Sequence, residues 1–201
     1  MRVLRVNQRA LINLFQTGGV VLAAVYLLTQ PVLVGHVHEL IEMMGLALVA
    51  LCVTGRMWGS LYIGAKKNRE LVTSGPYSIS RNPLYLFSTI GAVGIGLIYG
   101  SVTAALVLGL LAYGVFVVTA MKEAEHLRAV FGSHYDAYAR QTPFFWPSFS
   151  RYRDMPEMAF SPKAVRRTFA DSLLFLAAFP AIEAIEHLQA DGTLPILMRL
   201  I

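Results

Sequence analysis

The chain has 201 residues, of which 56% are hydrophobic and only 14% are charged, and its mean hydropathy is +0.56. A soluble domain of average composition is about 45–50% apolar and about 25% charged, so these values indicate a small integral membrane protein and exclude a disordered chain or a disulfide-rich secreted scaffold. The single cysteine, Cys52, excludes an internal disulfide and a CxxC metal site, and the net charge of +5 is the kind of basic excess that reports orientation in a membrane.

Apolar runs predict where the first half of the chain crosses the membrane. No Lys, Arg, Asp or Glu occurs from Ala10 to His38, and about 20 helical residues cross a hydrocarbon core. We therefore predict a first span over residues 11–34. A second apolar run predicts a span over 43–63, with Arg56 near a helix end, where its side chain can reach the interface.

The longest uncharged segment predicts a helical hairpin. Forty residues between Arg81 and Lys122 carry no formal charge, and as a helix they would measure about 60 Å, twice the thickness of the bilayer core. Gly100-Ser101 is the expected turn, which gives spans over 84–99 and 102–121.

The last apolar run, from Ser172 to Ile182, is too short to cross a membrane alone. A fifth span over about 170–188 is therefore left open. The expected fold is one all-α polytopic membrane domain over residues 1–201, with four or five transmembrane helices.

The distribution of basic residues sets the expected orientation. Sixteen of the 17 Lys and Arg residues precede the first span or lie between 56 and 81 or between 122 and 167. The positive-inside rule places the N-terminus and the segments 64–83 and 122–169 in the cytoplasm, as in a bacterial-type inner membrane. Both polar segments then meet at one membrane face, where an active site is expected.

The 64–83 segment has the features of an anion site. Gly75-Pro76 forces a turn, and Pro83 suits the first turn of the next helix. Arg81, Asn82 and the first free amides of that helix are expected at the cytoplasmic interface, where they can bind a carboxylate or phosphate. A basic loop that anchors lipid headgroups is the alternative.

The segment after the hairpin carries a carboxylate at the expected membrane exit. Glu123 and Leu127 follow helical spacing, so the fourth helix should continue out of the membrane to a cap at Gly132. Tyr135 and Tyr138 share one face of the turn or short helix that follows. A solvated helix end with interfacial tyrosines is the alternative.

Together the two segments resemble the isoprenylcysteine carboxyl methyltransferase and phospholipid methyltransferase family of integral membrane enzymes. The shared pattern is Leu-Val-Thr-x-Gly-Pro-Tyr from Leu71, then Arg-x-Pro-x-Tyr from Arg81, then a Glu-containing helix that ends in Leu-x-x-x-Phe-Gly-x-x-Tyr-x-x-Tyr. The resemblance covers about residues 50–147. It implies S-adenosylmethionine bound at the cytoplasmic face, and a lipid or lipid-linked acceptor that is methylated on a carboxylate or an amine.

The resemblance also implies which residues form the site. The catalytic residues would be Glu123 and Arg81, and no metal is expected. The cofactor-binding residues would be Leu71, Val72, Gly75, Pro76, Tyr77, Arg81, Asn82, Pro83, Tyr85 and Glu123.

Three positions depart from the family pattern. Asn82 stands where a histidine usually precedes the proline, Arg69 stands where histidine is frequent, and Ala124 occupies the second place of a frequent Glu-Glu pair. Asn82 can donate a hydrogen bond but cannot titrate. These departures bear most on the identity of the acceptor.

Two other functional classes remain open, as does the oligomeric state. One is a reductase of the sterol-reductase type that uses NADPH, and the other is a non-enzymatic membrane scaffold or transporter subunit. The pairs His38/Glu42 and Glu183/His187 have the ligand types and i, i+4 spacing of a metal site, although a polar network at the outer helix ends explains them as well. Nucleic acid is not an expected partner.

Overall fold

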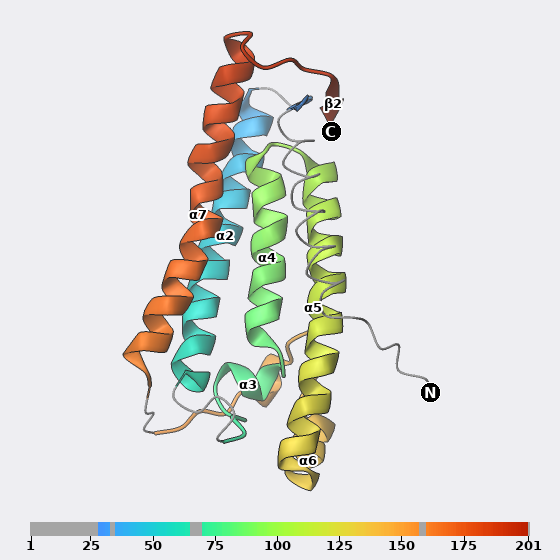
Figure 1. Cartoon of the computed structure of the whole chain (residues 1–201), viewed down its shortest axis with the longest axis vertical. Coiled ribbons are helices and arrows are strands. Elements are labelled where there is room, and N and C mark those ends of the chain that lie inside the picture. The colour runs from blue at the N-terminus through green and yellow to red at the C-terminus, as the bar shows by residue number, and fades with distance from the viewer. Residues whose placement is uncertain (1–27, 33–34, 65–69, 157–159, 201) are drawn as a thin grey trace.

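The computed structural model describes residues 28–32, 35–64, 70–156 and 160–200 (Figure 1). The elements in chain order are β1 (Thr29–Pro31), α2 (His36–Ile63), α3 (Pro76–Ile79), α4 (Pro83–Ile98), α5 (Val102–Phe131), α6 (Ser133–Gln141), the 3-10 helix η1 (Phe149–Arg151), α7 (Pro162–Ala190) and β2 (Met198–Leu200).

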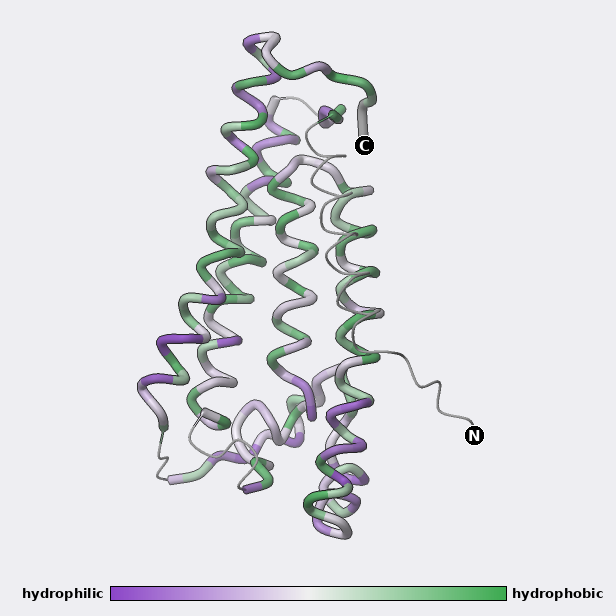
Figure 2. The backbone as a smooth tube through the Cα atoms, in the orientation of Figure 1, coloured by the Kyte–Doolittle hydropathy of each residue, from purple (hydrophilic) through white to green (hydrophobic). Residues whose placement is uncertain are grey.

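Helices dominate the architecture. In the described part of the chain, α2, α5 and α7 are each long and apolar enough to cross a membrane, and α4 is a shorter apolar helix of 16 residues. Helix α4 packs between α2 and α5, while α7 packs mainly on α2. Figure 2 shows hydrophobic residues along the middle of these helices and hydrophilic residues at the end that carries α3 and α6. The prediction of an all-α polytopic membrane protein is confirmed.

Most of the span expected over 11–34 lies outside the described residues. At its described end the prediction is wrong, because Thr29–Pro31 is the short strand β1 and not a helix. This strand pairs in parallel with Met198–Leu200, far along the chain. The pairing satisfies backbone groups that a helix would have satisfied internally.

Two glycines explain how closely α2 and α4 pack. A Cβ atom added at Gly45 would lie 2.6 Å from the backbone nitrogen of Ile98, and one added at Gly94 would lie 2.8 Å from the carbonyl oxygen of Gly45. Small residues at such contacts let helix backbones approach one another in a membrane. The neighbouring core residues Val49 and Tyr99 are buried.

The expected hairpin forms between α4 and α5. Gly100 adopts a φ of +75°, which favours glycine, and the hydroxyl of Ser101 accepts a hydrogen bond from the amide of Ala104 at 3.1 Å. Helix α5 then runs for 30 residues to Phe131 and is capped by Gly132, which has a φ of +55°. Glu123 is therefore carried on a continuous helix past the expected span of 102–121.

The last helix is longer than the run 170–188. Helix α7 begins at Pro162, directly after Ser161, whose hydroxyl accepts from the amide of Ala164 at 3.3 Å. This cap lets three polar turns precede the apolar run, and Pro180 lies inside the helix. Helix α2 likewise begins at His36, seven residues before the expected 43.

Candidate functional site

The two polar segments that flank the hairpin are joined by hydrogen bonds. The amide of Gly75 donates to the carbonyl of Arg153 at 2.7 Å, and the hydroxyl of Tyr138 donates to the carbonyl of Tyr77 at 2.8 Å. The hydroxyl of Ser80 donates to the carbonyl of Phe145 at 2.8 Å. These bonds hold residues 75–82 against the chain that follows α5, so both segments lie at one end of the helices.

A cavity of about 630 Å³ opens at this end of the helices. Residues from α2 to α7 line it, and its volume lies within the range of about 300–1,000 Å³ that is common for small-molecule sites. Five of the ten residues predicted to bind the cofactor line the cavity: Tyr77, Arg81, Asn82, Tyr85 and Glu123.

The other five predicted residues do not line the cavity. Val72 is buried and packs with Tyr62 and Tyr77. Gly75 has a φ of +57° and lies against the Tyr62 ring, so a side chain there would clash. Buried prolines at 76 and 83 begin α3 and α4, and Leu71 is half-buried.

Arg81 and Asn82 lie directly before the N-terminus of α4. The Asn82 side-chain amide donates to the carbonyl of Phe144 at 2.7 Å. Asparagine can therefore donate a hydrogen bond at the position where the family usually has histidine. The Arg81 guanidinium lies over the Phe144 ring, 5.1 Å from its centroid. Within the described residues, Nε of Arg81 is buried and has no hydrogen-bond partner. An arginine donor beside a helix N-terminus suits a ligand carboxylate.

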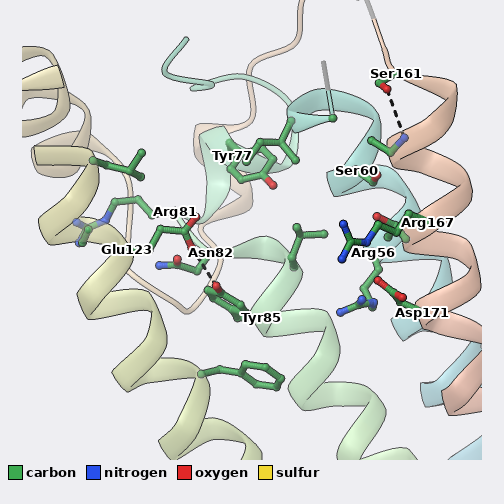
Figure 3. A pocket seen from close by; sticks show the side chains of 18 of the residues that line it. Arg56, Ser60, Tyr77, Arg81, Asn82, Tyr85, Glu123, Ser161, Arg167 and Asp171 are labelled. Carbon is green, nitrogen blue, oxygen red and sulfur yellow. Dashed lines mark hydrogen bonds between the residues drawn. The ribbon is translucent and has the colours of Figure 1, made fainter. Parts of the chain in front are cut away.

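Glu123 lies on the same side of the cavity as Arg81, Asn82 and Tyr85 (Figure 3). The hydroxyl of Tyr85 donates to Oε2 of Glu123 at 3.0 Å, and the Tyr85 ring stacks on Phe116 with 5.3 Å between ring centroids. The carboxylate is therefore held by a side chain whose own position is fixed by packing.

Buried tyrosines form the part of the cavity nearest α3 and α6. Burial, with smaller effects from neighbouring Tyr138 and Glu123, raises the pKa of Tyr77 well above its usual value. Burial also raises the pKa of Tyr138, with a smaller effect from Tyr135. Both phenols remain protonated at neutral pH and act as hydrogen-bond donors or acceptors. In the described structure the Tyr77 hydroxyl is buried without a partner.

The wall formed by α2 and α7 was not predicted as part of the site. Arg56, Lys163, Arg167 and Asp171 all line the cavity. The last three follow i, i+4, i+8 spacing, which places them on one face of a helix. This spacing was the one signal in the sequence for that wall. It does not show that Arg56 lies nearby, because only the packing of α7 on α2 brings the two helices together.

The two His/Glu pairs lie far from this cavity, near the opposite ends of α2 and α7. The structure brings the pairs near one another, since Glu42 and Glu183 are close enough for their charges to interact. Among the described residues, no group of three or more His, Cys, Asp or Glu side chains is placed to hold a metal ion.

The polar groups in the cavity fit S-adenosylmethionine. The buried Nε of Arg81 suits its carboxylate, the Glu123 carboxylate suits its ribose hydroxyls or ammonium group, and the buried Tyr77 hydroxyl offers a further polar contact. An aromatic and aliphatic lining that includes Phe116 and Leu127 can cover its apolar parts.

Comparisons with known proteins show the family of the chain. Residues 20–134 match the family model for phospholipid methyltransferase. The chain is 35% identical over 151 residues to the nickel-cobalt-cadmium resistance protein NccN of Alcaligenes xylosoxydans xylosoxydans, which covers 75% of this chain and 70% of that protein. It is 34% identical over 158 residues to the cobalt-zinc-cadmium resistance protein CzcN of Cupriavidus metallidurans, with 79% and 73% covered. No solved structure matches significantly. The chain belongs to the phospholipid methyltransferase family.

Proposed function

We propose that the protein transfers a methyl group from S-adenosylmethionine to a lipid or lipid-linked acceptor at the cytoplasmic membrane face. One observation carries the proposal. Arg81 and Glu123, far apart in the sequence, line one cavity beside the N-terminus of α4, at the hydrophilic end of an apolar bundle. Membership of the phospholipid methyltransferase family supports the same reaction.

The chain's residues mainly bind and align the reactants. When bound, S-adenosylmethionine would supply an electrophilic methyl group for in-line displacement, with S-adenosylhomocysteine as the leaving group. Arg81 and the first amides of α4 would hold its carboxylate, while Tyr85 keeps Glu123 oriented toward the cavity.

The role of Glu123 depends on the acceptor. An acceptor carboxylate is already ionised and needs no base. An acceptor amine must lose a proton, and Glu123 is the candidate base because its carboxylate lines the cavity. Methylation of an amine should therefore fail at low pH, whereas methylation of a carboxylate should persist above the pKa of the acceptor acid.

Calorimetric titration of S-adenosylhomocysteine into the detergent-solubilised protein tests the proposal. Wild type should bind saturably, and Arg81→Ala and Glu123→Gln should bind at least about tenfold more weakly, as expected for the loss of a charge-assisted contact. Glu125→Gln is the matched control, because Glu125 is exposed on the same helix and does not line the cavity.

The same titration separates the rival class. The relatives are named as metal resistance proteins, and a non-enzymatic scaffold or transporter subunit in such a system has no need of this ligand. Folded wild type that binds no S-adenosylhomocysteine in detergent or in lipid would favour that class over a methyltransferase.

A further inference from the structure

The cavity has two walls of different chemistry (Figure 3). Arg81, Tyr85 and Glu123 form the wall assigned above to the cofactor. On the other side, α2 and α7 contribute Arg56 and Arg167, together with the further charged residues of α7. Helix α7 lies outside residues 20–134, which match the family model, so the family pattern assigns no role to its side chains.

Arg56 is a positive charge within a helix long and apolar enough to cross a membrane. It lies seven residues before the end of α2, about 10 Å along the helix axis. Its guanidinium donates to the hydroxyls of Ser88 on α4 and Ser172 on α7, the latter at 3.0 Å. These hydroxyls fix its position without neutralising its charge. An arginine at such a depth is costly unless it has a functional partner.

The charges on this wall are unbalanced. Lys163 and Arg167 are exposed and share one face of α7 with Asp171. In the part of the chain that the structure describes, neither they nor Arg56 form an ion pair. Three cations against one carboxylate leave the wall with two positive charges. The cofactor adds one more, because its sulfonium and ammonium groups outnumber its carboxylate.

An anion is therefore the complement that the filled cavity lacks. Apolar side chains at the α2 side of the same cavity, Ile63 and Leu84, offer a surface for a hydrocarbon chain. A ligand that satisfies both features carries a phosphate or carboxylate group on an apolar chain.

We propose that Arg56, Lys163 and Arg167 form the acceptor site, in which they bind the anionic group of an amphiphilic acceptor and place it opposite Glu123. That the bound anion is the methyl acceptor rests on the proposed function, but anion binding at this site can be tested without the cofactor. The three residues are specificity determinants of the acceptor, and the cofactor wall does not depend on them.

The test is calorimetric titration of amphiphiles with one common tail into the full chain in a non-ionic detergent. Dodecyl phosphate and dodecanoate carry the anionic group, dodecyltrimethylammonium carries the opposite charge, and inorganic phosphate tests the free anion. The variants are Lys163→Ala, Arg167→Ala and Arg56→Lys. Arg166→Ala is the matched control, because Arg166 is exposed on the same helix but does not line the cavity.

Wild type and Arg166→Ala should bind at least one anionic amphiphile saturably and should not bind the cationic one. Lys163→Ala and Arg167→Ala should each bind it at least about tenfold more weakly, while their affinity for S-adenosylhomocysteine stays unchanged. Inorganic phosphate should bind far more weakly than dodecyl phosphate, because it lacks the chain. Arg56→Lys keeps the charge but loses the two-hydroxyl fit, so it should bind the amphiphile less tightly than wild type.

Three results would overturn the proposal: equal binding of cationic and anionic amphiphiles, unchanged anion binding in both α7 variants, or loss of S-adenosylhomocysteine binding in those variants with the amphiphile unaffected. Failure of the proposed function would give a different result. In that case wild type binds the anionic amphiphile but not S-adenosylhomocysteine.

Discussion

Replacing Tyr85 by phenylalanine removes one hydroxyl and leaves the stacked ring in place. The lost bond is the 3.0 Å contact to Glu123, and the ring stays 5.3 Å from Phe116. A hydrogen bond to a charged group contributes about 1.5–3 kcal/mol when buried, but water can reach this half-buried carboxylate, so we expect about 1 kcal/mol of stability to be lost. Freed from Tyr85, Glu123 must be ordered when the cofactor binds, which should weaken binding by about 1 kcal/mol, or ~fivefold in Kd.

Two measurements on Tyr85→Phe check this reasoning: calorimetric Kd for S-adenosylhomocysteine and thermal unfolding in detergent. Tyr113→Phe is the matched control, because Tyr113 packs on Phe145 and Trp146 and does not line the cavity. It should bind as wild type does. If Tyr85→Phe also binds like wild type while Glu123→Gln binds weakly, then Tyr85 does not position the carboxylate and that step of the argument is wrong.

Two further predictions concern the scaffold. Gly94→Ala should lower the free energy of unfolding by about 1–3 kcal/mol, because the added Cβ would lie 2.8 Å from the carbonyl oxygen of Gly45. Gly114→Ala is the control and should not destabilise the protein, because Gly114 has open space around it. Equal melting temperatures of the two variants would refute the close packing of α2 and α4. Hydrogen bonds from two tyrosine hydroxyls and a backbone amide hold the pKa of Asp154 below its ordinary value of 3.8, so its stabilising effect is complete above pH 3.8 and is lost as the pH falls through the lowered pKa. Acid titration followed by the fluorescence of Trp58, which packs on one of those tyrosines, should show this release, and an unchanged profile in Asp154→Asn would contradict it.

The apolar runs of the sequence predict α4 and the hairpin because both depend on local signals. The 40 uncharged residues between Arg81 and Lys122 would form a helix about twice as long as the bilayer core is thick, so they require a turn. Gly100-Ser101 supplies that turn. The strand at Thr29–Pro31 has no such signal, because three residues show no alternation and the partner strand is nearly 170 residues away. Likewise, the start of α7 at Pro162 was not predicted, because its first turns carry charged residues that do not continue the apolar run. These residues belong to the same helix all the same, on its cavity-facing and exposed sides.

The candidate site divides in the same way. Arg81, Asn82 and Tyr85 lie within five residues of one another, and Glu123 follows at the end of a helix that the hairpin folds back, so motif reasoning can find them. Arg56 and Arg167 line one cavity only because of how α2 and α7 pack, which neither segment specifies locally. Motif residues such as Val72 turn out to support the wall from behind, because burial is decided by tertiary contacts.

The most direct test of the central claim is transfer of a labelled methyl group from S-adenosylmethionine to an extract of bacterial membrane lipids. The account predicts label in the lipid fraction with wild type and with Glu125→Gln, and a large loss of label with Arg81→Ala. Alkaline hydrolysis of the product then separates a methyl ester, which releases the label, from a methylated amine, which keeps it. Folded wild type that binds S-adenosylhomocysteine but labels no lipid or lipid-linked molecule would contradict the account.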